Sequence, residues 1–159
     1  MKTSKLKKIL FIVLLCNFVF GCGYQSILNK EDQIYSIKEF SLEGNKRLGG
    51  LLKNNLITPK TDENNLIVNI KAQKKNQISN KSETGKVLKY SVSLTFEITA
   101  VKVIDKNIVL SQVYSKKQDY PASDVYLNTI NNEKKVLEGM VESIANEILI
   151  GLSSIYKEK

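Results

Sequence analysis

The sequence predicts an α+β domain in which a four-stranded, mostly antiparallel sheet is covered on one face by two helices, as a two-layer sandwich. Two patterns carry this prediction. Residues 87–120 alternate between apolar and polar side chains over much of their length, which is typical of a long hairpin. Residues 127–156 repeat apolar side chains every three or four positions, which is typical of an amphipathic helix. A hairpin alone is marginally stable in water, so other elements must cover its apolar face.

The first strand of the hairpin divides its side chains between two faces, because successive residues of a strand point in opposite directions. Residues 105–107 form the turn before the second strand. Val101 and Val103 would lie on the polar face, which indicates either a bulge near Ala100 or a local buried contact. The expected inward residues are Leu88, Tyr90, Val92, Leu94, Phe96, Ile98 and Ala100, and the expected outward ones include Lys89, Ser91, Ser93, Thr95, Glu97 and Thr99.

A strand and a helix are expected before the hairpin. Residues 34–42 form a candidate strand, and the turn Glu43-Gly44-Asn45 leads into a helix that ends near Ile57. Gly49 and Gly50 each cost that helix about 1 kcal/mol relative to alanine. Close packing of the helix against the sheet would explain both glycines.

A further strand is expected over residues 66–73, with its apolar residues at every second position. Residues 74–86 contain few apolar side chains and predict a long, solvated, charged loop. The closing helix needs no special partner, because its apolar stripe suits core packing against the sheet. That stripe comprises Ile130, Leu137, Val141, Ile144, Ile148, Leu152 and Ile155.

Composition argues against an enzyme. The 159 residues include no histidine, which removes the usual general base and the commonest nitrogen ligand for metals. No close pair of carboxylates stands in a suitable loop, so we expect no catalytic residues, no metal site and no cofactor. Of the 24 basic residues only Arg47 is arginine, and 24 − 1 = 23 are lysines. Lysine cannot form the bidentate hydrogen bonds by which arginine recognises base edges, so no nucleic-acid partner is expected.

The first residues predict export and lipidation. Four lysines precede the apolar run 9–20, which is too short to cross a bilayer and is typical of a signal peptide over residues 1–21. The sequence Val19-Phe20-Gly21-Cys22 resembles the bacterial lipobox, whose cysteine is acylated and becomes the first residue after cleavage. The alternative is an ordinary signal peptide with an incidental cysteine. Cleavage removes four lysines and no acids, so the mature chain carries 20 − 16 = +4 charges.

The mature chain, a tether over residues 22–33 and a single domain over residues 34–159, resembles the LPS-assembly lipoprotein family (LptE). The likeness rests on Cys22-Gly23-Tyr24-Gln25, on the segment 83–94 (ETGKVLKYSVSL), on the polar, tyrosine-bearing stretch 114–120 and on the long closing helix. By resemblance to bacterial lipoproteins, Gly23 favours sorting to the outer membrane.

Membership of this family would imply a protein without catalytic residues or cofactor that plugs an outer-membrane β-barrel (LptD-like) and helps to place lipopolysaccharide in the outer leaflet. The hydroxyl face of the hairpin suits a polar barrel lumen, because hydroxyls exchange hydrogen bonds without the desolvation cost of buried charges. Basic residues near the sheet would meet the anionic lipid. The candidate contacts are Lys71, Lys86, Lys89, Ser91, Ser93, Thr95, Lys116 and Lys117.

Two other functions remain open from the sequence. A different lipid-anchored binding module, such as an accessory lipoprotein of a transporter or a secretion pilot, would share the anchor and the layers. A lipoprotein enzyme that uses lysine or carboxylate chemistry is the third, and it lacks a recognisable site.

Overall fold

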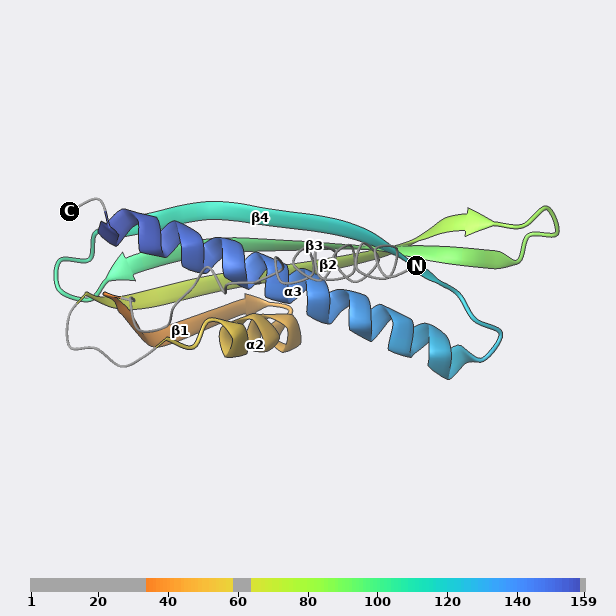
Figure 1. Cartoon of the computed structure of the whole chain (residues 1–159), viewed down its shortest axis with the longest axis horizontal. Coiled ribbons are helices and arrows are strands. Elements are labelled where there is room, and N and C mark those ends of the chain that lie inside the picture. Colours follow the sequence, from red (N-terminus) through yellow and green to blue (C-terminus); the bar gives the residue numbers. More distant parts are fainter. Residues whose placement is uncertain (1–33, 59–63, 158–159) are drawn as a thin grey trace, which may run out of the picture.

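The computed structural model describes residues 34–58 and 64–157. The predicted signal peptide (1–21), the lipidation site Cys22 and the tether (22–33) lie outside these described residues. The order of strand, helix, three strands and helix is confirmed (Figure 1). The elements are β1 (Ser36–Gly44), α2 (Lys46–Asn55), β2 (Asn65–Lys81), β3 (Val87–Lys102), β4 (Ile108–Pro121) and α3 (Tyr126–Lys157).

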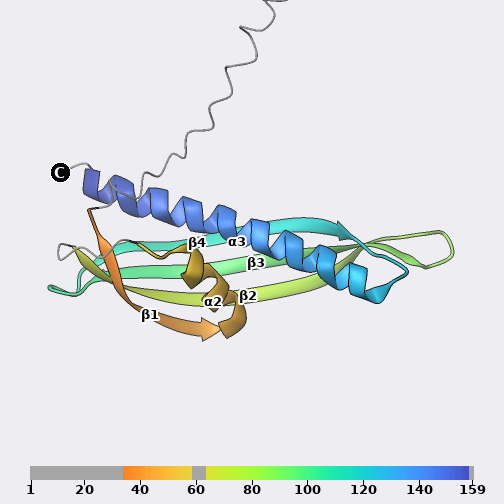
Figure 2. The same cartoon turned by 60° about the horizontal axis from the view of Figure 1, so that its bottom comes forward.

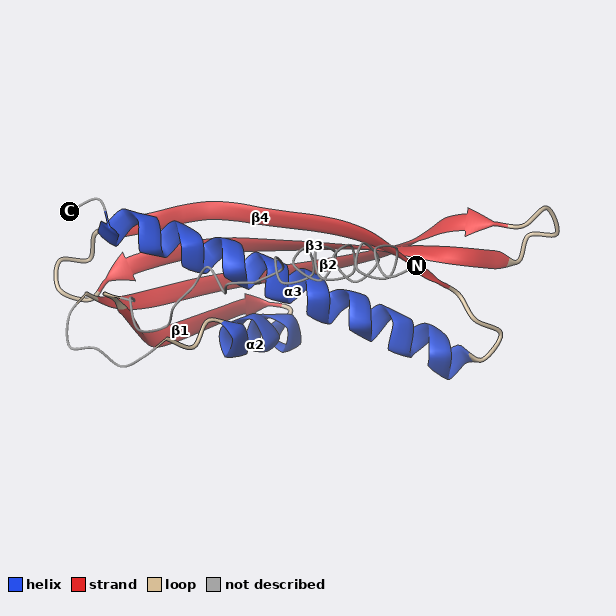
Figure 3. Ribbon diagram, in the orientation of Figure 1, coloured by secondary structure: helices blue, strands red, loops and turns tan. Residues whose placement is uncertain are grey.

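The four strands form one sheet in the order β1-β2-β3-β4. β1 and β2 run parallel because α2 carries the chain back to the start of the sheet, whereas β2, β3 and β4 are antiparallel neighbours. Both helices lie on the same side of the sheet (Figures 1 and 3), and α3 runs along the strands above β3 and β4 (Figure 2). The predicted α+β two-layer architecture is therefore confirmed. We call the face that the helices cover the inner face and the opposite one the outer face.

The core lies between the inner face and the two helices. Phe96 at the centre of β3 is fully buried and lies opposite Ala72 of β2 and Tyr114 of β4. Each large apolar side chain buried in this way contributes about 1.5–3 kcal/mol before conformational entropy is subtracted. The core residues of β3 are Val92, Leu94, Phe96, Ile98 and Ala100, and α2 and α3 add Leu48, Leu52, Val141, Ile144, Ile148 and Leu152.

The far end of the hairpin differs from the prediction. Leu88 is 42% exposed, because the end of β3 next to the β2–β3 turn extends past the start of α3 (Figure 1). The predicted loop over residues 74–86 is also wrong: β2 continues to Lys81 and pairs with β3 as far as Val87. The backbone of β3 needs hydrogen-bonding partners along its whole length, whatever side chains the partner strand carries.

The junction of β1 and α2 depends on a glycine. Gly44 has φ 70°, a conformation that side chains disfavour, and a Cβ atom there would collide with the carbonyl oxygen of Ala72. The next residue, Asn45, caps α2 by accepting a hydrogen bond from the Leu48 amide at 3.2 Å. The predicted helix cap at Asn45 is thus confirmed, although Glu43 and Gly44 still belong to β1 and only Asn45 separates the strand from α2.

Two smaller expectations have different outcomes. A Cβ atom on Gly49 would lie 3.4 Å from the Leu42 side chain, so close packing against the sheet does explain this glycine, whereas Gly50 faces open space. The pairing of β3 with β4 shifts register between Ala100 and Val101, which confirms the bulge.

Candidate partner-binding surface

The outer face is the candidate site, because none of the described helices or loops packs across its centre. Alternate residues of β2, β3 and β4 form rows across this face. In the central row Gln73, Thr95 and Ser115 lie side by side, and the hydroxyls of Thr95 and Ser115 are 3.2 Å apart. The row offers an amide and two hydroxyls, which both donate and accept hydrogen bonds.

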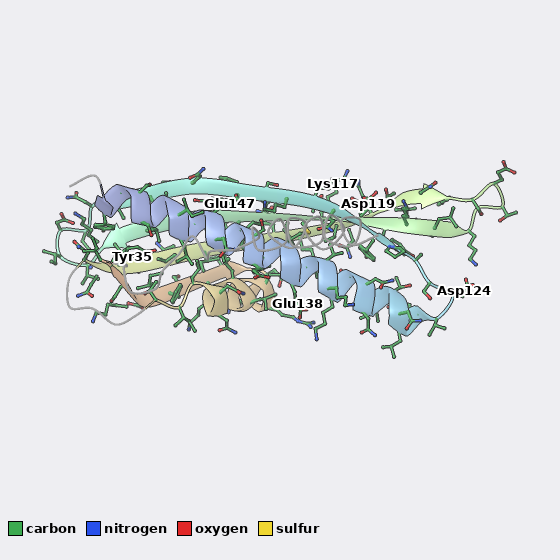
Figure 4. The ribbon with its side chains drawn as sticks, in the orientation of Figure 1. Tyr35, Lys117, Asp119, Asp124, Glu138 and Glu147 are labelled. Atoms are coloured by element: carbon green, nitrogen blue, oxygen red, sulfur yellow. The ribbon has the colours of Figure 1, made fainter. Side chains whose placement is uncertain are left out.

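The neighbouring row joins two lysines through a serine. Ser93 lies between Lys75 of β2 and Lys117 of β4 in the strand register. Figure 4 shows Lys117 on β4 beside Asp119. Within residues 34–58 and 64–157, neither Lys75 nor Lys117 forms a salt bridge, so both ammonium groups are available to an anionic ligand.

A third row carries an ionised carboxylate. Gln77, Ser91 and Asp119 share it, and the hydroxyl of Ser79 donates a hydrogen bond to Asp119 Oδ2 at 2.7 Å. This bond, and to a lesser extent the neighbouring Ser91 hydroxyl, lowers the pKa of the Asp119 carboxyl. Ser91 is 1% exposed, and its Oγ has no hydrogen bond of standard geometry in the structure.

A fourth row lies on the other side of the central row, and its lysine forms an ion pair, unlike Lys75 and Lys117. Lys71 Nζ lies 3.1 Å from Glu97 Oε2, and both side chains are nearly half exposed. Val113 completes this row and is 62% exposed. Exposed pairs of this kind contribute little stability, so this row makes the face less cationic without holding the sheet together.

Five of the eight predicted contact residues lie on this face of three adjacent strands, and of these Ser91 is buried, which leaves Lys71, Ser93, Thr95 and Lys117 accessible to a partner. By strand alternation Lys89 faces the same way, nearer the β2–β3 turn. Lys116 does not belong to this surface, because it lies on the inner face and contacts Glu147 of α3 at 2.6 Å. Lys86 lies beside the β2–β3 turn and pairs with Asp124.

Several members of this surface were not predicted from the sequence. Lys75 and Gln77 fell in the segment expected to be a loop, Gln73 ended the strand predicted before it, and none of these three, nor Ser115 or Asp119, was proposed as a contact. The pairing of β3 could have predicted them. A strand that begins at Val87 needs a neighbour along its whole length, and the residues before the β2–β3 turn are placed to provide it.

The inner face has its own polar cluster, near the start of α3. Lys74 Nζ and Asn76 Nδ2 donate to Glu133 Oε1 at 2.7 and 2.9 Å. Burial by itself would raise the pKa of Glu133, but these bonds outweigh it and lower the pKa. Burial, followed by the charge of Glu133, raises the pKa of Tyr120 to about 12. The cluster borders a groove of about 540 Å³ between α2 and α3, and its charges already neutralise one another.

The outer face offers hydrogen-bonding groups together with charged side chains of both signs. β2, β3 and β4 contribute four lysines (71, 75, 89 and 117) and two carboxylates (97 and 119) to this face, and β1 adds Glu39 and Glu43 in register with Ile67 and Lys71, so these side chains carry 4 − 4 = 0 net charge among neutral hydroxyls and amides. In the part of the chain that the structure describes, no group of potential metal ligands occurs. Neither described helix is long and apolar enough to span a membrane.

Solved structures with a similar fold include lipoproteins. Rare lipoprotein B from Shewanella oneidensis matches with a TM-score of 0.54 at 15% identity, over 76% of this chain and 97% of its own. Lipoprotein B from Nitrosomonas europaea matches with a TM-score of 0.59 at 15% identity, over 85% of this chain and 93% of its own. Identities this low establish the shared fold alone. No family model and no curated protein sequence matches the chain.

Proposed function

We propose that this protein is an outer-membrane lipoprotein, anchored through Cys22, that binds within a large outer-membrane β-barrel, assists its assembly and takes part in lipopolysaccharide transport to the outer leaflet. The observation that carries the proposal is the polar outer face, on which hydroxyls, amides and unpaired lysines line three adjacent strands. The lumen of a large barrel is polar, so a plug must present groups that exchange hydrogen bonds with it.

Three further points support the proposal. The lipobox-like sequence before Cys22 accounts for the export signal and for the cysteine that would otherwise be a free thiol. The fold is shared with proteins described as lipoproteins. The rigid sheet also suits a plug, because β3 is paired on both sides and its outward side chains keep fixed spacing.

Photo-crosslinking in living cells tests the partner. A photoreactive residue at Thr95 or Lys117 should give an adduct with an outer-membrane barrel, identified by mass spectrometry. The matched control is Glu142, which is exposed on the helical side of the domain. Equal capture of the barrel from all three positions, or capture of soluble proteins only, would contradict the proposal.

The anchor is tested separately. Cys22→Ser should abolish incorporation of labelled fatty acid and release the protein from the membrane fraction, because acyl chains provide the stable attachment. Cys16→Ser is the control, since Cys16 belongs to the segment expected to be removed. Unchanged labelling of the Cys22 variant would refute the anchor while leaving the barrel partner open.

A further inference from the structure

Three parts of the chain meet at one end of the sheet, which we call the anchor-side end. The Val103 amide, in the β3–β4 turn, donates to the Asn65 carbonyl at 2.9 Å. The neighbouring Asn64 donates through Nδ2 to the carbonyl of Ile34, the first described residue, at 2.9 Å. The last turns of α3 are also here, beside Tyr35 (Figure 4). The domain is therefore attached to its N-terminal segment at the same end as the β3–β4 turn.

This turn exposes an apolar side chain that no described residue covers. Ile104 is 89% exposed, and Ile108 and Ile34 at the same end are 64% and 45% exposed. Single exposed apolar residues are common, but here three exposed isoleucines belong to the same end of a small domain. Lys106 lies two residues beyond Ile104 in the same turn, whereas Lys102 Nζ lies over the Tyr156 ring of α3, 6.0 Å from its centroid.

The turn holds Ile104 in a defined position. The carboxylate of Asp105 accepts hydrogen bonds from the Asn107 amide at 3.1 Å and from Asn107 Nδ2 at 2.7 Å. The backbone bond from Asn107 is the main reason that the pKa of Asp105 is lowered. Lys106 takes the left-handed conformation, with φ 57°, that a tight turn requires. A turn fixed by its own hydrogen bonds loses little entropy when its tip enters an apolar environment.

Chain length brings this end to a membrane if Cys22 carries lipid. Residues 23–33, which number 33 − 22 = 11, separate Cys22 from Ile34 and span at most about 40 Å when fully extended. α3 alone, with 32 residues, is about 48 Å long. The anchor-side end therefore stays within about 40 Å of the lipid on Cys22, whereas the β2–β3 turn at the opposite end can lie farther from that lipid.

We propose that the β3–β4 turn is a second membrane contact, in which Ile104 enters the bilayer surface and Lys106 contacts lipid phosphates. The occupant is the lipid surface itself. An apolar tip with a lysine in the same turn matches the layers of that surface, with acyl chains below and phosphates above. The inference rests on the anchoring at Cys22 given under the proposed function. The contact would orient the domain end-on, leaving the outer face free for a protein partner.

The chain contains no tryptophan, so a single introduced one reports its own environment. The experiment uses the full lipidated chain in vesicles of phosphatidylethanolamine and phosphatidylglycerol, with and without brominated acyl chains. Ile104→Trp should show blue-shifted emission and quenching by the brominated lipids. Thr84→Trp is the matched control, because Thr84 is exposed in the β2–β3 turn at the opposite end of β3, and its emission should stay that of water.

The outcomes separate this proposal from the anchor. If the chain floats with the vesicles but Ile104→Trp is unquenched, or is quenched no more than Thr84→Trp, the second contact is refuted and the anchor stands. If the chain does not float, the anchor and this dependent proposal both fail. Ile108→Trp provides a second reporter, which should be quenched less than Ile104→Trp. If neither variant is quenched, the proposal is overturned, even if one of them folds poorly.

Discussion

The two faces of β3 are built from alternate residues of one strand, yet they have opposite environments. On the inner face Leu94, Phe96 and Ile98 are at most 1% exposed beneath the helices. On the outer face Ser93 and Thr95 are half-buried by their strand neighbours alone. The inner face therefore provides most of the folding free energy, and residues only one position away are free to serve binding.

The inner face itself changes character along its length. Phe96 belongs to the apolar core, with the ion pair of Lys116 and Glu147 at the edge of the sheet, whereas nearer the β2–β3 turn the side chains of Lys74 and Asn76 meet Glu133 of α3. Hydrogen bonds and a partly buried ion pair hold that part of the helix, which is a weaker and pH-sensitive form of attachment. The substitutions below test both contrasts.

The largest expected effect separates the faces directly. Phe96→Lys places an unpaired charge in the apolar core and should destabilise the domain by about 4 kcal/mol or more, enough to unfold it. Its neighbour Thr95→Lys loses only a hydroxyl contact on the open face and should cost at most about 1 kcal/mol. Chemical denaturation followed by circular dichroism measures both. Similar midpoints for the two variants would show that the faces are wrongly assigned.

A second substitution tests the connection from β1 to α2, through which the chain passes from the sheet to the helices on its inner face. Gly44→Ala forces an alanine into a left-handed conformation and against the Ala72 carbonyl, and should destabilise by about 2 kcal/mol or more. Gly50→Ala is the control of opposite sign: it lies within α2 and faces open space, so it should stabilise by up to about 1 kcal/mol. Thermal melting of both variants gives the comparison, which fails if Gly44→Ala melts at or above the wild-type temperature.

The central sheet and the closing helix were predictable because their periodicities come from the burial that stabilises them. The spacing of Leu94, Phe96 and Ile98 predicts the inner face of β3, and the spacing of Ile144 and Ile148 predicts the stripe of α3 that covers it. The far half of β2 was missed because its inward residues include Lys74 and Asn76, whose partner Glu133 is 57 or more positions away in the sequence. Periodicity cannot reveal a polar face whose cover is a distant carboxylate.

The candidate surface was only partly predictable for a related reason. Serines and threonines on β3 were identified by alternation, but Lys75 depended on recognising its strand. Lys116 and Lys117 were proposed together, although adjacent residues of a strand point to opposite faces, and the structure separates them accordingly. Lys117 faces outward because it pairs with Ser93 of β3, and Lys116 faces inward because it pairs with Leu94. The local sequence of β4 does not determine this register between the strands.

A third substitution tests the polar attachment of α3. Glu133→Gln weakens the bonds from Lys74 and Asn76 and should cost about 1 kcal/mol at neutral pH. The pKa of Glu133 is lowered on folding, so its contribution is complete above the ordinary value of 4.5 and is lost as the pH falls through the folded-state value. Denaturation measured from pH 7 downward should show the wild type and the variant converging below that value. A difference that stays constant with pH would contradict this role.

The smallest effect is expected on the outer face, at the pair of Lys71 and Glu97. Both side chains are nearly half exposed, so water screens their attraction, and Lys71→Ala should change stability by no more than about 0.5 kcal/mol. The substitution removes one of the charges that we assign to partner contact. Barrel capture from Thr95 should therefore respond to Lys71→Ala more than the unfolding midpoint does, measured by crosslinking yield and by denaturation of the same preparation. A large loss of stability would mean that the outer face also supports the fold, and the division between the two faces of the sheet would have to be abandoned.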